Sequence, residues 1–76
     1  MKLIQGDLLT LKENCKYCVV ASVLLNNLEY AYLINIDNYY DNMIVQYDDH
    51  SVEVVTDQKL INVLWLEFNK QVKNID

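Results

Sequence analysis

The chain has 76 residues and a net charge of −5, and 53% of its residues are hydrophobic. A chain of this length forms one domain, and its apolar fraction is too high for intrinsic disorder. No apolar run approaches the ~20 residues that cross a bilayer, and the first residues lack the apolar stretch of a secretory leader. We therefore expect a cytoplasmic protein.

The charges are distributed unevenly along the chain. Residues 17–58 contain seven acids and no lysine or arginine, whereas the six lysines lie towards the two ends. Nucleic acids and anionic membranes are bound through basic surfaces, usually rich in arginine, and this chain contains no arginine. The distribution argues against direct binding to DNA, RNA or a membrane, and it favours a basic protein surface as the partner.

The first three predicted strands form two hairpins. Residues 8–11 predict a short strand, and the β-branched and apolar runs at 17–25 and 28–36 predict two longer ones. Asn26 and Asn27 suit a two-residue type I′ turn, which requires positive φ at both positions and fixes the register. The register predicts one wholly apolar face, made of the pairs Leu25–Leu28, Val23–Tyr30, Ala21–Tyr32, Val19–Ile34 and Tyr17–Ile36.

A further hairpin is predicted after a loop at residues 37–41. Its strands span 42–47 and 51–55, and Asp48-Asp49-His50 forms the turn between them. Gln46 and Glu53 interrupt these strands at alternating positions, as half-exposed strands do.

From Gln58 the apolar period changes from two residues to three or four. The apolar residues then fall within an arc of roughly 140° on a helix. They are Leu60, Ile61, Leu64, Trp65, Phe68, Val72 and Ile75. Thr56 or Asp57 supplies the N-cap oxygen. We expect Trp65, in the middle of the arc, to pack on the sheet face that carries Tyr30, Tyr32 and Ile34.

The sequence therefore predicts a single α+β domain over residues 1–76. Residues 1–56 form an antiparallel meander of about five short strands, and residues 57–75 form one amphipathic helix. The meander is either an open sheet or a curled, partly open barrel of SH3-like kind.

Two groups of residues could carry chemistry. Cys15 and Cys18 have the spacing of a redox or zinc motif, but residues three apart in a strand lie about 10 Å apart, beyond the ~7 Å of a disulfide. A zinc site would need two further ligands. The trio at residues 48–50 lies at an exposed turn, whereas catalysis requires a sheltered site. We therefore expect no enzymatic activity and no cofactor. We interpret the two thiols as structural or incidental.

Two other sets of residues are candidates for contacts with proteins. Tyr39 and Tyr40 are adjacent in a short acidic loop and cannot both point inward, so one of them should face solvent, and exposed tyrosines are typical interface anchors. The predicted partner surface comprises Tyr39, Tyr40, Asp41, Asp48, Asp49 and Glu53. Val63 and Leu66 lie off the main apolar arc of the helix and predict a self-association surface.

The pattern resembles that of small uncharacterised domains of low-GC Gram-positive bacteria, their phages and their conjugative elements. The matching features are Gly6-Asp7 before a strand, Tyr17-Cys18-Val19-Val20, Glu29-Tyr30-Ala31-Tyr32-Leu33 after a turn, and the helix from Asp57. The likeness is one of overall pattern and carries no residue-level function. In size and acidity the chain is also similar to phage anti-CRISPR and anti-restriction proteins.

Charge and composition predict a small, acidic, non-enzymatic interaction protein. It would inhibit or modulate a basic, nucleic-acid-binding host protein such as a defence nuclease. One alternative is a structural or accessory domain that works through self-association. A metal-dependent enzyme is the third class.

Overall fold

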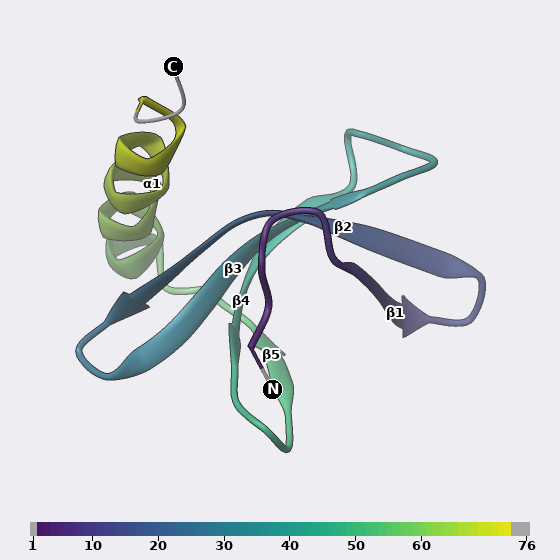
Figure 1. Ribbon diagram of the computed structural model, residues 1–76, viewed down its shortest axis with the longest axis horizontal. Coiled ribbons are helices and arrows are strands. Elements are labelled where there is room, and N and C mark those ends of the chain that lie inside the picture. Colours follow the sequence, from purple (N-terminus) through teal and green to yellow (C-terminus); the bar gives the residue numbers. More distant parts are fainter. Residues whose placement is uncertain (1, 74–76) are drawn as a thin grey trace.

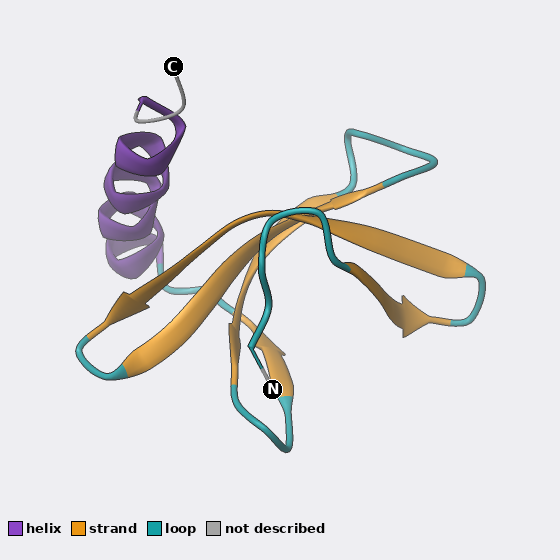
Figure 2. Ribbon diagram, in the orientation of Figure 1, coloured by secondary structure: helices purple, strands orange, loops and turns teal. Residues whose placement is uncertain are grey.

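The computed structural model describes residues 2–73 of the chain. Its elements are β1 (Leu8–Lys12), β2 (Cys15–Leu25), β3 (Leu28–Asn35), β4 (Asn42–Tyr47), β5 (Val52–Val54) and α1 (Gln58–Lys73). The five strands form one antiparallel sheet in the order of the chain, and the sheet curls into a half-barrel (Figure 1; Figure 2). These features confirm the predicted α+β class and the curled form of the meander. No helix in residues 2–73 is both long and apolar enough to cross a membrane.

Asparagines form the tight turns of the meander. Asn26 and Asn27 have φ of 53° and 66°, and Asn14 has φ of 62° in the turn between β1 and β2. Asparagine tolerates this left-handed region better than most residues because its short side chain bonds the local backbone. Leu25 pairs with Leu28 across the turn, which confirms the predicted two-residue hairpin.

A β-bulge in β2 changes the predicted register halfway along the hairpin. Val23 pairs with Tyr30 and Ala21 with Tyr32, as predicted, but the register shifts between Val19 and Ala21. The predicted pairs of Val19 with Ile34 and Tyr17 with Ile36 are therefore wrong. Val19 pairs with Leu33 and Tyr17 with Asn35. The extra residue moves one end of β2 to the opposite face of the sheet, since neighbouring strand residues point in opposite directions.

The bulge gives the sheet two apolar faces. The inner face of the curl carries a buried cluster, here called the inner cluster. Its members are Leu3, Tyr17, Val19, Ala31, Leu33, Val45 and Tyr47. The N-terminal segment crosses this face in front of the strands (Figure 1), and the Leu3 N–H donates a 3.1 Å hydrogen bond to Tyr47 Oη. The N-terminal segment thereby covers the core of the half-barrel.

The opposite face, here called the helix face, is covered in part by α1. Leu64 and Phe68 are buried against Ala21, Tyr30 and Ile44. The Asp57 carboxylate accepts a 3.0 Å bond from the Lys59 N–H, so Asp57 rather than Thr56 is the N-cap. The Val72 side chain and Ile75, both placed on the predicted arc, lie outside the described residues, as does the predicted end of the helix at residue 75.

The expected packing of Trp65 is confirmed for one of its partners. The Trp65 ring meets the Tyr32 ring edge-on, with centroids 4.7 Å apart. Tyr30 belongs to the same buried cluster under the helix. Ile34, in contrast, lines a hollow whose other residues come from β2 and the loop after β3, so α1 leaves part of its own face uncovered.

Candidate functional site

The uncovered part of the helix face carries two open hollows. Alternation along β3 places Ile34 on the same face as Tyr32 and Tyr30, so the apolar surface under α1 continues beyond the helix. Contiguous exposed apolar surface of this kind marks interaction sites. We therefore describe the two hollows and the loop between them as one candidate site.

The first hollow, here called the outer hollow, has a volume of about 450 Å³. It is lined by Cys18, Val20, Ile34, Ile36 and Tyr39. Cys18 and Ile34 are direct neighbours across β2 and β3, and the bulge brings Val20 beside them. The register shift that buries Val19 inside the curl thus creates this apolar surface outside it.

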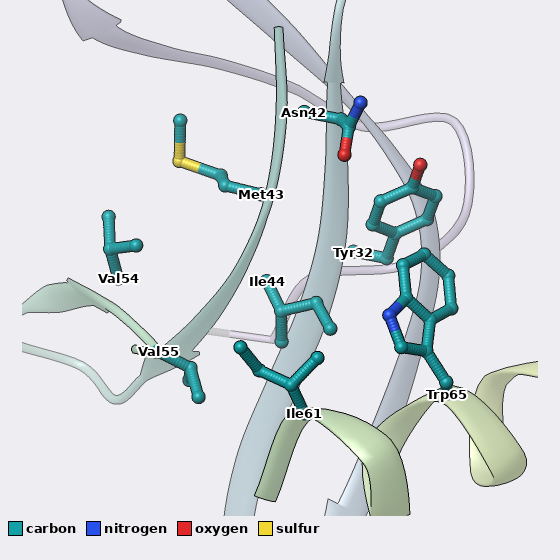
Figure 3. Close-up of a pocket in the computed structure, with 8 residues that line it drawn as sticks. All are labelled: Tyr32, Asn42, Met43, Ile44, Val54, Val55, Ile61 and Trp65. Carbon is teal, nitrogen blue, oxygen red and sulfur yellow. The ribbon is translucent and has the colours of Figure 1, made fainter. Parts of the chain in front are cut away.

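The second hollow, here called the edge groove, has a volume of about 240 Å³ (Figure 3). Its walls are Tyr32, Asn42, Met43, Ile44, Val54, Val55, Ile61 and Trp65. Figure 3 shows Met43 and Val54 on one side of β4 and Tyr32, Ile44 and Trp65 on the other. The groove therefore lies across the edge of β4, next to the start of α1.

The loop at residues 36–41, here called the tyrosine loop, lies between the two hollows. Tyr39 lines the outer hollow, whereas Asn42 at the end of the loop lines the edge groove. The Asn42 amide donates to the carbonyls of Tyr39 and Tyr40 at 3.4 and 3.3 Å. The side chains of Tyr39 and Tyr40 are 76% and 96% exposed. Two tyrosines thus project from a loop whose backbone is tied down.

Asp41 holds the base of this loop. Its Oδ2 accepts a 2.6 Å hydrogen bond from the Tyr17 hydroxyl and a 3.1 Å bond from the Asn35 amide. The Tyr17 hydrogen bond, followed by that of Asn35, lowers the pKa of Asp41 below its ordinary value. The same bond to Asp41, with burial, raises the pKa of Tyr17. Asp41 was predicted as a partner contact, and the structure places its carboxylate in this internal network.

Sequence reasoning missed the network of Tyr17, Asn35 and Asp41. One signal was available, because a buried tyrosine needs a partner for its hydroxyl. A fully buried Tyr17 on a strand could therefore have pointed to a nearby acceptor. The Asn35 side-chain oxygen Oδ1 also accepts a 2.8 Å bond from the Asp37 N–H, so this side chain ends β3 and begins the loop.

The remaining predicted contacts lie at the other end of β4. Asp48 and Asp49 follow β4, whereas Tyr39, Tyr40 and Asp41 precede it, and six strand residues span roughly 20 Å. Figure 1 shows the two loops at opposite ends of the sheet. Glu53, on β5, pairs with Gln46 of β4 and is exposed near the end of β4 that Asp48 follows. The six predicted residues therefore form two separate surfaces.

Asp48 also has a local structural role. Its Oδ1 accepts bonds from the backbone N–H groups of His50 and Ser51, at 2.7 and 2.9 Å. These bonds, that from His50 first, lower the pKa of Asp48. The carboxylate therefore stabilises the turn between β4 and β5.

Val63 and Leu66, the predicted self-association residues, are exposed on α1. They line a shallow hollow with Glu67, Asn69 and Lys70. Because Leu64 and Phe68 face the sheet, this second surface is on the outward side of the helix.

The two cysteines lie on different faces of β2. Cys15 packs against the inner cluster and Cys18 lines the outer hollow, and both are free thiols. Within residues 2–73, no group of three or more histidine, cysteine or acidic side chains is arranged to hold a metal ion.

Comparisons with protein-family models, with curated proteins and with solved structures gave no match. The site is therefore interpreted from its own geometry.

Proposed function

We propose that this protein is a non-enzymatic binding protein that binds a basic partner protein through the uncovered helix face. The contact surface is the tyrosine loop together with the outer hollow and the edge groove. By occupying a nucleic-acid-binding surface in the cytoplasm, it inhibits or modulates the partner.

One observation carries the proposal. Tyr39 and Tyr40 are almost fully exposed in a loop that Asp41 and Asn42 hold in place, and apolar hollows flank that loop. Tyrosine buries a large area at a small entropic cost, and a fixed loop loses little further freedom on binding. Exposed tyrosines beside apolar hollows are suited to form the centre of an interface.

The charge distribution supports a basic partner. Asp37 is exposed within the tyrosine loop, and the exposed Glu53 and Asp57 lie within two residues of Val54 and Val55, which line the edge groove. No lysine or arginine occurs between residues 17 and 58. Complementary charge around an apolar centre speeds association and excludes acidic competitors.

The experiment is affinity capture from a bacterial lysate, followed by calorimetry on the purified partner. Tyr40→Ala should weaken binding about ten-fold or more, as expected for an interface anchor. Leu66→Ala, which removes an apolar side chain that is 65% exposed on the outward side of α1, is the control. Glu53→Lys should slow association and reduce its dependence on salt. Wild-type affinity of Tyr40→Ala, together with unchanged association of Glu53→Lys, would contradict the proposal.

A second candidate function is self-association through the outward side of α1. The hollow formed by Val63 and Leu66 is the observation that favours it. Sedimentation at micromolar concentration tests it, because Leu66→Asp should convert a dimer into a monomer. A wild-type protein that remains monomeric would exclude this candidate.

A further inference from the structure

The edge of β4 is only partly covered by β5. Strand β5 pairs with Val45, Gln46 and Tyr47. The Val55 N–H then donates a 2.8 Å bond to the Ile44 carbonyl, and the chain leaves for α1. The first part of β4, from Asn42, therefore extends beyond the last partner that β5 supplies.

The backbone of Asn42 faces this open edge. The Ile44 carbonyl points towards β5, whereas the Asp41 carbonyl points towards β3, where it accepts from the Asn35 N–H at 2.9 Å. Backbone groups alternate between the two sides of a strand, so Asn42 presents its N–H and C=O on the same side as Ile44. An open strand edge is a template for pairing with another extended chain.

The edge groove has the shape that such a chain requires. Successive side chains of an extended segment point to opposite faces. The groove offers an apolar wall for each face, with Met43 and Val54 on one side of β4 and the Trp65 and Tyr32 rings on the other (Figure 3). A groove for a helix would need one continuous wall instead. The geometry therefore favours an extended segment over a helical one.

We infer that the edge of β4 at Asn42 binds an extended segment of the basic partner by strand addition. The segment continues the line of β5, bonds the outward N–H and C=O of Asn42, and places neighbouring apolar side chains against the two walls. We expect basic residues to flank this apolar core, because the exposed Glu53 and Asp57 lie within two residues of the groove residues Val54 and Val55 in the chain. This inference rests on the proposed function and names the segment that the site recognises.

The first test uses two variants at one position. Asn42→Pro removes the outward N–H, and proline is tolerated on an edge strand where the N–H faces solvent. Asn42→Ala removes the same side chain, including its bonds to the tyrosine loop, but keeps the N–H. Binding is measured with the capped peptide KKVLVKK by titration of the ¹⁵N-labelled protein, followed at the backbone amides and at the Trp65 indole.

We expect KKVLVKK to shift the amides of Ile44 and Val55 and the Trp65 indole. Asn42→Pro should bind up to about ten-fold more weakly than Asn42→Ala, as the loss of one backbone hydrogen bond implies. The same peptide N-methylated at its three central residues tests this bonding from the ligand side, even if Asn42→Pro does not fold. It should also bind about ten-fold more weakly to the wild-type protein.

The remaining outcomes separate the two proposals. Equal binding of the N-methylated and unmodified peptides, with shifts confined to the tyrosine loop and the outer hollow, would overturn strand addition and leave the proposed function standing. Equal binding of EEVLVEE would overturn the basic partner in both proposals. No shift at Ile44, Val55 or Trp65 at about 1 mM peptide would overturn strand addition. A wild-type dimer that dissociates on Asn42→Pro substitution would also overturn strand addition by the partner, because a second copy of the chain would then occupy the edge.

Discussion

The hydroxyl of Tyr17, a residue fully buried in the inner cluster, donates a 2.6 Å hydrogen bond to Asp41 Oδ2 at the base of the tyrosine loop. Tyr17→Phe keeps the ring in the core and removes this bond. We expect the pKa of Asp41 to rise towards its ordinary value, because the Tyr17 bond is the largest cause of its depression. Carboxyl NMR titration measures the change, and an unaltered Asp41 pKa would show that the bond does not form in solution.

Acid should destabilise the protein through Asp41. Its folded pKa lies below its ordinary value, so the stability it contributes is present above about pH 4 and is lost as the pH falls through the folded pKa. Asp41→Asn should flatten the stability profile below pH 4. Asp48, whose pKa is also lowered, continues to titrate in that variant and leaves a residual slope. Urea unfolding between pH 2.5 and 6 tests this, and a wild-type profile in Asp41→Asn would contradict it.

The bulge predicts opposite behaviour for two neighbouring residues. Leu33 is fully buried opposite Val19, so Leu33→Ala should cost about 2–5 kcal/mol of unfolding free energy. Ile34 lines the outer hollow, so Ile34→Ala should cost less than Leu33→Ala and should weaken partner binding. Urea unfolding measures both. In the regular register without a bulge, the order of the two losses would be reversed.

The helix start allows a direct comparison of adjacent caps. Asp57→Ala should destabilise the protein by about 0.5–2 kcal/mol, because its carboxylate accepts from the Lys59 N–H. Thr56→Ala, one residue earlier, should stay within about 0.5 kcal/mol of wild type. Thermal unfolding distinguishes the two variants. A larger loss at Thr56 would place the N-cap one residue earlier.

Trp65 both packs on the sheet and lines the edge groove. Trp65→Ala should cost about 3–5 kcal/mol, the range for aromatic residues removed from a core, and should largely unfold a domain this small. Leu66→Ala, at the next and exposed position, should leave the melting curve almost unchanged. A native-like melting curve for Trp65→Ala would mean that the Tyr32–Trp65 contact contributes little to the fold.

Local patterns in the sequence were sufficient to predict most of the fold. Two asparagines in succession require little more than their own backbone preference to form the turn at 26–27. The apolar arc around Leu64 and Phe68 follows from helical periodicity alone. The bulge could not be predicted in this way, because Val20 is as β-branched and apolar as Val19. Only packing on two opposite faces distinguishes the two valines.

The candidate site was predicted in part. Exposure of one tyrosine was expected from the position of Tyr39 and Tyr40 in a short acidic loop, and the structure exposes both. The outer hollow depends on how much of the sheet α1 covers. The edge groove depends on where β5 stops pairing with β4. Both are tertiary relationships with no local sequence signal. The internal hydrogen bonds of the Asp41 and Asp48 carboxylates were likewise not predictable, because in the sequence these acids resemble free surface charges.

The bulge at Val20 also has a consequence for how the chain folds. Because β2 contributes Val19 to the inner cluster and Ala21 to the cluster under α1, neither core can form without the same strand. Strands β3 and β4 also contribute residues to both clusters, so the two cores should unfold in a single cooperative transition. Strands that pair in chain order make most contacts between near neighbours in the sequence, which favours rapid folding with the β2–β3 hairpin in the nucleus.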